Sequence, residues 1–293
     1  MRALLLHNPK AGRADHTKAD LVAALAATGL DISYCSTRDD AFPDCLAKDF
    51  DAVIVAGGDG TVAKVVKQLP DRRRPVGIVP LGGANNVATS LGIPRGALVT
   101  AGGPGAAVVR DLHVGHVRGP SGKTSFLEGV GFGPLAASIA AEEPPAASVG
   151  EKIANGRRSF AAALARLEAA EADLTIDGEA LAGRWLMVEV LTFSHSGPRL
   201  PLAPRSKGLE GALSVVLLEE DRRSAMLDWL NDPEGSDPPV RVAVGRRISF
   251  RLDRDRPFRI DDDTAGATGH QIEIGIDAEP LRVLVPERRH GDG

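Results

Sequence analysis

The chain has 293 residues and a formal net charge of −4, and 4% of its residues are aromatic. Because this length exceeds that of a usual single hydrophobic core, we expect two domains. The slight acidity and the scarcity of aromatic rings exclude a typical nucleic-acid-binding protein, which shows a basic face and, for single strands, stacking rings.

Cysteine content and hydropathy indicate the cellular compartment in which the protein is expected. Cys35 and Cys45 form neither a disulfide framework nor a Cys-x-x-Cys pair. The apolar start of the chain is too short for a signal peptide, and no apolar run approaches the roughly 18 to 20 residues of a membrane span. We therefore expect a cytoplasmic protein that contacts membranes only peripherally.

Strands and helices alternate in the first part of the chain. Apolar periodicity predicts strands at residues 2–7, 30–36 and 51–56 and helices at residues 17–28 and 39–48. This alternation favours a parallel sheet that binds its ligand at the carboxyl ends of the strands. The loops that begin at Asn8 and Gly57 follow the first and third strands, so we expect both at that edge.

The third strand leads into Gly57-Gly58-Asp59-Gly60-Thr61, and a helix follows. Glycines let the backbone N–H groups approach a phosphate, and a helix N-terminus favours negative charge. Asp59 would repel a bare phosphate, which suggests an intervening divalent cation such as Mg²⁺. A strand-to-helix turn that needs glycine only for its geometry explains an isolated motif equally well. The motif is neither a P-loop nor a Rossmann fingerprint.

A second glycine-rich turn repeats this arrangement. Residues 76–79 read as a strand, Pro80-Leu81-Gly82-Gly83-Ala84 as a turn, and a helix is expected from about Asn85 to before Pro94. Asn85 as a simple helix N-cap is the alternative interpretation. Two such turns on neighbouring strands favour a ligand site.

Three segments together resemble the diacylglycerol kinase catalytic-domain family, which includes sphingosine and ceramide kinases and bacterial lipid kinases. They are Asn8-Pro9-Lys10-Ala11-Gly12, Gly57-Gly58-Asp59-Gly60-Thr61 and Pro80-Leu81-Gly82-Gly83-Ala84-Asn85-Asn86. Gly-Gly-Asp-Gly-Thr alone also occurs in the related NAD kinases and phosphofructokinases. The resemblance implies an N-terminal three-layer α/β domain of the NAD kinase and diacylglycerol kinase type, and a mainly β-sandwich second domain. We expect residues 1–110 to bind the nucleotide, residues 111–281 to bind the lipid, and residues 282–293 to return to the first domain.

The resemblance also implies site residues, with ATP bound in the cleft between the domains. It implies that Asp59 and Asp111 bind a Mg²⁺ ion. Gly83 stands where the family usually has Thr or Ser, and Asn86 where many members have Asp. The residues expected to hold ATP are Asn8, Pro9, Lys10, Ala11, Gly12, Thr37, Gly57, Gly58, Asp59, Gly60, Thr61, Gly82, Gly83 and Asn85.

The second half of the chain reads mainly as strands. Residues 128–133 resemble the family's Gly-x-Gly-Phe turn, residues 134–149 read as a loop, and residues 159–172 as an amphipathic helix. Many short strands with Gly and Pro punctuation indicate a sandwich. The expected strands are residues 173–177, 184–193, 212–218, 240–244, 247–252, 257–261, 271–276 and 281–285.

A lipid alcohol needs a carboxylate to accept its proton during phosphoryl transfer. The family uses a late Asp-Gly-Glu segment, and three segments compete for this role. Asp177-Gly178-Glu179 matches literally but suits a hairpin turn, and Asp277-Ala278-Glu279 lies too close to the closing strand. We choose Asp263 as the base with Asp261 beside it, and a solvated acidic turn is the alternative interpretation.

These patterns predict an ATP- and Mg²⁺-dependent lipid kinase. Its catalytic residues are expected to be Asp263, Asp261 and Asp59, and its acceptor a hydroxyl of diacylglycerol, ceramide or a sphingoid base at a membrane surface. A kinase of a soluble alcohol or NAD, and a nucleotide-binding regulator without turnover, are the alternatives. An exposed sandwich edge allows a homodimer.

Overall fold

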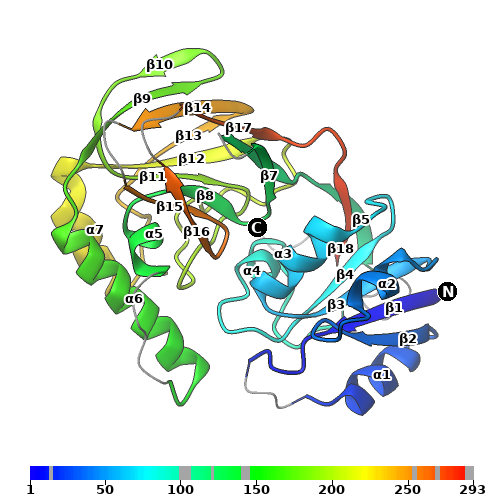
Figure 1. The fold of residues 1–293 in the computed structure, drawn as a ribbon. Helices are drawn as coiled ribbons and strands as arrows, with labels where there is room; N and C mark the ends of the chain where they lie inside the picture. The colour runs from blue at the N-terminus through cyan, green and yellow to red at the C-terminus, as the bar shows by residue number, and fades with distance from the viewer. Residues whose placement is uncertain are drawn as a thin grey trace. The chain divides into compact units, whose positions relative to one another are not determined.

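The computed structural model describes residues 1–12, 16–98, 107–119, 122–139, 146–252, 256–267 and 271–287. Contacts divide the chain into two compact units (Figure 1). The first unit comprises Met1–Leu112 with Glu279–Gly293, and the second comprises His113–Ala278. No helix among the described residues is long and apolar enough to cross a bilayer.

Within the described residues, the first unit is built on a six-stranded sheet in the order β2-β1-β3-β4-β18-β5. The strands β1 to β4 are mutually parallel, β18 is parallel to β4, and β5 is antiparallel to β18 at the edge. The strands are β1 (Arg2–His7), β2 (Asp31–Ser36), β3 (Ala52–Gly57), β4 (Val76–Pro80), β5 (Ala107–Leu112) and β18 (Leu281–Pro286).

Helices follow the parallel strands. Thr17 caps the first helix by accepting a hydrogen bond from the Asp20 backbone N–H, which fixes its start. Every residue of β3 is buried, so both faces of the sheet are covered, which confirms the expected three-layer α/β architecture. The helices are α1 (Lys18–Ala26), α2 (Phe42–Ala47), α3 (Asp59–Gln68) and α4 (Asn86–Ser90).

The second unit is a β-rich domain, as expected. Its described strands form a 12-stranded antiparallel sheet along the path β16-β15-β8-β11-β9-β14-β17-β6-β7, to which β10, β12 and β13 are added. The strands are β6 (Gly115–Gly119), β7 (Gly122–Phe126), β8 (Gly129–Phe132), β9 (Ala170–Ile176), β10 (Glu179–Leu181), β11 (Arg184–Leu191), β12 (Leu213–Glu219), β13 (Arg241–Gly245), β14 (Arg247–Leu252), β15 (Arg256–Ile260), β16 (Asp263–Ala267) and β17 (Gln271–Ile276).

Aromatic side chains from distant strands share one core in this unit. The rings of Phe132 and Phe250 lie 5.8 Å apart between centroids, and those of Phe250 and Phe258 lie 5.9 Å apart. Trp185 and Phe126 belong to the same buried cluster. Since these residues come from β7, β8, β11, β14 and β15, the sheet folds so that both halves face one interior, as in a sandwich.

A second apolar cluster lies where helices cover β11 and β12. The helices are α5 (Pro134–Ile139), α6 (Val149–Arg166), the 3-10 helix η1 (Glu220–Arg222) and α7 (Arg223–Trp229). Leu135, Phe160 and Met226 pack there with Leu186 and Leu218 from the strands. Because this cluster and the aromatic core both draw on β11, that strand is buried on both faces.

Two expectations for this region were wrong. The predicted loop 134–149 begins as helix α5, because Leu135 and Ala136 are buried; residues 140–145 lie outside the described residues. The helix expected at 159–172 runs from Val149 to Arg166, since Ser148 caps its start and Ala170 already pairs with Trp185 in the sheet.

The predicted Gly-x-Gly-Phe turn is a strand, β8. A Cβ atom on Gly131 would lie 2.1 Å from the Val188 carbonyl oxygen, so glycine is needed for close approach to β11.

Candidate functional site

In the first unit, the two glycine-rich turns touch backbone to backbone. A Cβ atom on Gly82 would lie 2.5 Å from the Cα atom of Gly58, and one on Gly58 would lie 3.0 Å from the Cα atom of Gly82. The Leu81 N–H donates to the Gly57 carbonyl at 2.9 Å. Since no side chain fits between the turns, the edge of the sheet here presents main-chain groups.

Asn85 closes the second turn. Its φ angle is +51°, in the left-handed region that Asn tolerates better than most residues. Its Oδ1 atom accepts from the Gly82 N–H at 2.8 Å, and its Nδ2 atom donates to the Gly82 carbonyl at 2.9 Å. Asn85 is the N-cap residue of α4, as the alternative interpretation expected, and its carbonyl accepts from the Thr89 N–H at 2.8 Å, but its side chain bonds within the turn instead of capping the helix.

The loop after β1 joins the same edge. The Asn8 N–H donates to the Ala56 carbonyl at 2.9 Å, and Asn8 Nδ2 donates to Thr61 Oγ1 at 3.1 Å. Gly12 has a φ of +59°, and a Cβ atom there would lie 2.2 Å from the Leu81 carbonyl oxygen. Pro9, Lys10 and Ala11 lie between these anchors, and Ala11 is buried while Lys10 is exposed.

The strand order places a topological switch point, where successive connections leave in opposite directions, at the carboxyl edge of the first sheet. β2 lies on one side of β1 and β3 lies on the other, so the loops after β1 and β3 diverge at their carboxyl ends. Open α/β sheets bind ligands in such crevices. Thr37 follows β2 at this edge, where its N–H donates to the His7 carbonyl and its own carbonyl accepts from Lys64 Nζ.

Asp59 is the first residue of α3, and its Oδ1 atom accepts a hydrogen bond from the Val87 N–H at 3.0 Å. The carboxylate therefore ties α3 to the first turn of α4. Gly60 and Gly83 lie beside it in the two turns, Gly60 exposed and Gly83 half-buried.

Asp111 does not join Asp59, and their expected pairing around a metal ion was wrong. Asp111 pairs with Arg282 across β5 and β18, and the Arg282 N–H donates to the Arg72 carbonyl, next to the amino end of β4. Asp59 follows the carboxyl end of β3. The five residues of β4 separate these edges by about 16 Å, whereas Mg²⁺ ligands lie at about 2.0–2.1 Å.

The donor set at the carboxyl edge suits a nucleotide-borne Mg²⁺. No group of three or more His, Cys, Asp or Glu residues converges anywhere in the part of the chain that the structure describes. Mg²⁺ in kinases is commonly bound by one or two carboxylates together with phosphate oxygens and water. Asp59 offers one such carboxylate, so the residues present fit a Mg²⁺ ion that is bound jointly with a phosphate ligand.

A chain of side-chain contacts through two histidines supports the loop after β1, and it was not evident from the sequence. We call this chain the histidine relay. His7 is 1% exposed; its Nδ1 atom lies 3.2 Å from the Tyr34 hydroxyl, and its Nε2 atom lies 2.9 Å from His16 Nδ1. His16 Nε2 reaches the Ala11 carbonyl at 3.1 Å. Burial lowers the pKa of His7, and His16 lowers it further. The relay holds the Asn8–Gly12 loop against β1 and β2.

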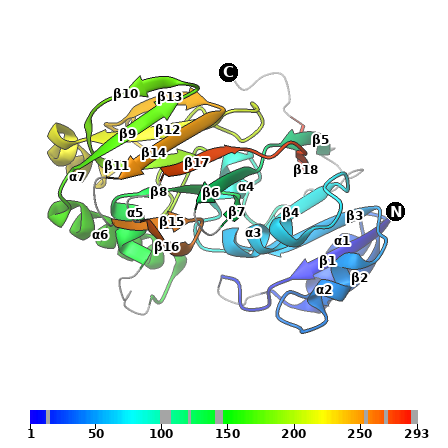
Figure 2. The ribbon, with the colours of Figure 1, turned by 45° about the horizontal axis from the view of Figure 1, so that its top comes forward.

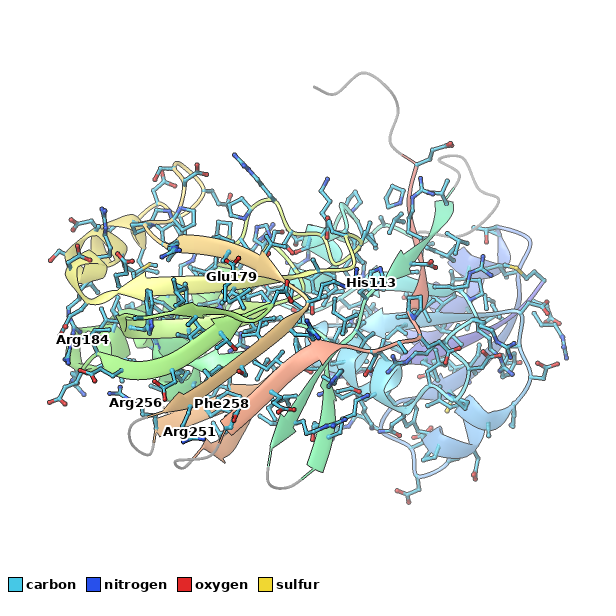
Figure 3. All side chains as sticks on the ribbon, turned by 90° about the horizontal axis from the view of Figure 1, so that it is seen from above. His113, Glu179, Arg184, Arg251, Arg256 and Phe258 are labelled. Carbon is cyan, nitrogen blue, oxygen red and sulfur yellow. The ribbon has the colours of Figure 1, made fainter. Side chains whose placement is uncertain are left out.

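The candidate base Asp263 and its neighbour Asp261 lie in the second unit, on the hairpin of β15 and β16. Ile260 pairs with Asp263, so Asp261 and Asp262 form the turn between the strands. Asp263 is exposed at the start of β16. Phe258, which is labelled in Figure 3, anchors the preceding strand in the core. Asp263 is thus a solvent-accessible carboxylate on a hairpin that is fixed at its base.

Asp261, which was expected to be catalytic beside Asp263, is held by the fold at the start of the hairpin turn. It is 5% exposed, with a φ of +53°. Its carboxylate accepts backbone hydrogen bonds from Leu127 at 3.0 Å, Glu128 at 2.8 Å and Gly129 at 3.3 Å. A carboxylate held by three backbone N–H groups fixes the turn that carries Asp263.

The two competing acidic segments are also held by the fold. Asp177 and Gly178 have φ angles of +51° and +92°, and they form the turn between β9 and β10 as a hairpin interpretation predicts. The Asp177 carboxylate accepts the backbone N–H groups of Arg246 and Arg247. Asp277 is 8% exposed and is bound by other side chains. Glu179 is exposed at the start of β10 (Figure 3).

A buried charge network beside the hairpin was likewise not evident from the sequence. Arg259 Nε donates to both carboxylate oxygens of Glu189 at 3.1 Å, and the exposed fractions of these side chains are 3% and 0%. Arg259 also donates to Ser196 Oγ at 2.7 Å and to the Asp261 carbonyl at 2.9 Å. Ser196 in turn donates to Glu128.

The charges in this network depend on one another. Burial raises the pKa of Glu189, and Arg259 opposes the rise. Burial alone would lower the pKa of the Arg259 guanidinium, but Glu189 and Glu128 raise it. Arg259 therefore stays protonated and links three segments around the Asp263 hairpin.

Comparisons with known proteins agree with this architecture. The sequence profile of the diacylglycerol kinase catalytic domain matches residues 2–115. A protein named "Probable lipid kinase YegS-like" from Cronobacter sakazakii is 30% identical over 220 residues, which cover 69% of this chain and 70% of that protein. A diacylglycerol kinase from Bacillus subtilis is 27% identical over 229 residues, 75% of this chain and 74% of that one. The crystal structure of a diacylglycerol kinase from Bacillus anthracis superposes with a TM-score of 0.69 at 19% identity, covering 97% of this chain and 96% of that one.

Proposed function

Because the chain belongs to the diacylglycerol kinase catalytic-domain family and is therefore a kinase, we propose that it transfers the γ-phosphoryl group of ATP to the hydroxyl of a membrane lipid. Diacylglycerol is the first candidate acceptor, and ceramide and sphingoid bases are the others. The reaction is proposed to require Mg²⁺ and to take place where the protein meets a membrane surface.

The contact between the Gly58 and Gly82 backbones is the observation that carries this proposal. It leaves main-chain N–H groups and the start of α3 at a switch point of the sheet. Such a surface suits phosphate groups, because N–H donors and the helix N-terminus both favour negative charge.

Each residue has a proposed task in the transfer. The Asn8–Gly12 loop and the two glycine turns hold the phosphates of ATP, and Asp59 holds the Mg²⁺ that accompanies them. A bound Mg²⁺ supplies charge neutralisation at the phosphate oxygens. Asp263 accepts the proton of the attacking hydroxyl, and Asp261 and Arg259 keep its hairpin in place.

Transfer of labelled γ-phosphate from ATP tests the proposal. The acceptors are diacylglycerol, ceramide, sphingosine, glycerol and NAD, the lipids being presented in detergent micelles, with and without Mg²⁺. We expect Mg²⁺-dependent label in a lipid, most strongly in diacylglycerol, and loss of that label in the Asp59→Asn variant.

The other outcomes separate the alternatives. Label in glycerol or NAD but in no lipid would replace the lipid acceptor with a soluble one. ATP binding without label in any acceptor would favour a nucleotide-binding regulator. Transfer that persists after Mg²⁺ is chelated would contradict the proposed metal requirement.

A further inference from the structure

The second unit carries a hollow of about 1130 Å³ on the outer face of β14, β17 and β6, which are neighbouring strands (Figure 2). Arg247 pairs with Gly275, and Gly275 pairs with His116, so these residues share one face of the sheet. Ile248 and Ile274, the next residues along, point into the core. None of the residues that line the hollow takes part in the proposed reaction.

Gly275 forms part of the floor of this hollow. A Cβ atom there would lie 3.0 Å from His116 Cε1 and 3.2 Å from His116 Nε2. The Cε1–Nε2 edge of the ring therefore lies over the glycine. His113, labelled in Figure 3, lines the same hollow.

Three guanidinium groups border the hollow, those of Arg118, Arg246 and Arg247. All three residues are exposed, and none makes an ion pair within the described ranges of the chain. The Asp177 carboxylate, which also lies here, accepts main-chain hydrogen bonds from Arg246 and Arg247. Glu273 pairs across the strands with Arg118. Asp277 is the third carboxylate that lines the hollow, and Lys123 binds it at 2.7 Å, so with Lys123 four cationic side chains face three carboxylates.

His116 adds an imidazole ring to the guanidinium groups that border the hollow. Its Nδ1 atom lies 3.2 Å from Asp277 Oδ1, and the same carboxylate binds Lys123 at 2.7 Å and Ser125 at 3.1 Å. Burial lowers the pKa of His116 and Lys123 lowers it further, although Asp277 opposes them. A neutral ring that carries its proton on Nδ1, beside the Asp277 carboxylate at 3.2 Å, leaves Nε2 as a hydrogen-bond acceptor near Gly275.

We propose that this hollow binds the phosphate ester of a polyhydroxy alcohol, with Arg118, Arg246 and Arg247 around the phosphate and His116 Nε2 accepting a hydrogen bond from a hydroxyl. Guanidinium groups match the geometry and charge of a phosphate. The hollow is large enough, since ligand pockets commonly measure about 300–1,000 Å³. A free ester such as glycerol 3-phosphate and the headgroup of phosphatidylglycerol share this chemistry.

The test follows the histidine Cε1–H resonances of the full-length protein by NMR during titration with glycerol 3-phosphate. The His116 resonance is assigned with the His116→Gln variant, and His7 in the first unit serves as an internal reference. This readout distinguishes the hollow from the nucleotide site. We expect a saturable shift of His116 but not of His7, and tighter binding of glycerol 3-phosphate than of inorganic phosphate.

Matched variants test the guanidinium groups. Arg118→Gln combined with Arg247→Gln should weaken binding by about tenfold or more, since both substitutions remove charged hydrogen bonds to the phosphate. Arg205→Gln removes an exposed arginine of the same unit outside the hollow and should leave the affinity unchanged. Far-ultraviolet circular dichroism confirms that each variant is folded.

Binding to lipid vesicles is the second experiment, and it tests the lipid headgroup as the ligand. Cosedimentation with phosphatidylglycerol vesicles, absent with phosphatidylcholine and lost in the double variant, would support the lipid headgroup as the ligand even without a response to the free ester. A His116 shift with the free ester alone would support a soluble ligand. The proposal is overturned if neither probe binds, if the double variant binds as tightly as the wild type, or if inorganic phosphate binds as well as glycerol 3-phosphate.

Discussion

Two acids that lie two positions apart on one hairpin have opposite environments. Asp261 is 5% exposed and accepts three backbone hydrogen bonds, whereas Asp263 is exposed to solvent. A base must reach its substrate, so the exposed carboxylate is suited to proton transfer and the buried one to fixing the turn.

Removing the Asp263 carboxylate should therefore affect chemistry rather than binding. We expect Asp263→Asn to lower kcat by about 10²–10⁴-fold, the usual contribution of a general base, while the Kd for ATP stays unchanged. Glu179→Gln is the matched control, because Glu179 is the exposed acid of the literal Asp-Gly-Glu segment. Steady-state kinetics and ATP titration measure both. Loss of activity in the control and not in Asp263→Asn would move the base to Glu179.

Arg259 and Glu189 should couple strongly in stability. Arg259→Met alone leaves the buried Glu189 carboxylate without its guanidinium, which should cost about 3–5 kcal/mol of unfolding free energy. The double variant with Glu189→Leu should be more stable than the sum of the two single changes predicts, by about 0.5–3 kcal/mol. Urea unfolding of the four proteins measures this coupling. Additive effects would show that the pair is energetically independent.

At the level of secondary-structure elements, the proposed nucleotide-binding edge of the first sheet depends on how closely two loops approach each other. The turns after β3 and β4 touch because both positions in contact, Gly58 and Gly82, lack side chains. A methyl group placed between them must push the turns apart, at about 1–3 kcal/mol for an overpacked contact.

Gly82→Ala should consequently weaken ATP binding by about tenfold or more, because the added Cβ atom meets Gly58 Cα at 2.5 Å and Asn85 Oδ1 at 2.7 Å. Gly119→Ala is the control, since a Cβ atom at Gly119 meets nothing within 4 Å and its φ is not in the left-handed region. Calorimetric titration with ATP compares the two variants. Equal affinity in both would show that the nucleotide does not use the contact between the turns.

At the scale of the whole molecule, buried histidines make stability depend on pH. Burial lowers the pKa of His7 in the first unit and of His116 and His195 in the second. The unfolded chain, in which histidines titrate near 6.5, then binds more protons than the native protein between that pH and the native pKa values. Stability should thus be complete above about pH 6.5 and fall as the pH drops below it.

Thermal melts between pH 7.5 and 5.5 test this expectation in both units. We expect Tm to decrease on acidification, and His7→Gln to make that decrease shallower. A Tm that rises towards pH 5.5 would mean that these histidines gain, rather than lose, affinity for protons on folding.

Much of the architecture could be predicted from the sequence because its signals are local. The strands at residues 2–7 and 247–252 were expected at their observed bounds, since apolar alternation and β-branching span only a few residues. The short strands β7, β10 and β16 and the helices α5 and α7 escaped prediction. Segments this short carry too few periodic positions, and their neighbours in the tertiary structure stabilise them.

Three features could be derived from the sequence alone: two glycine-rich turns follow buried strands, a carboxylate lies beside the first turn, and a β-rich domain follows. These features depend on residues adjacent in the chain. The accessibility of the acids depends on long-range contacts, because the groups that bind them are remote in the chain: the Glu128 N–H that binds Asp261 lies 133 positions away. The tertiary structure also separated Asp111 from Asp59, because β5 reaches the sheet only through β18, a strand from the far end of the chain. The glycine-rich turns thus follow from neighbouring residues, whereas the positions of the acidic side chains follow from strand pairing between distant parts of the chain.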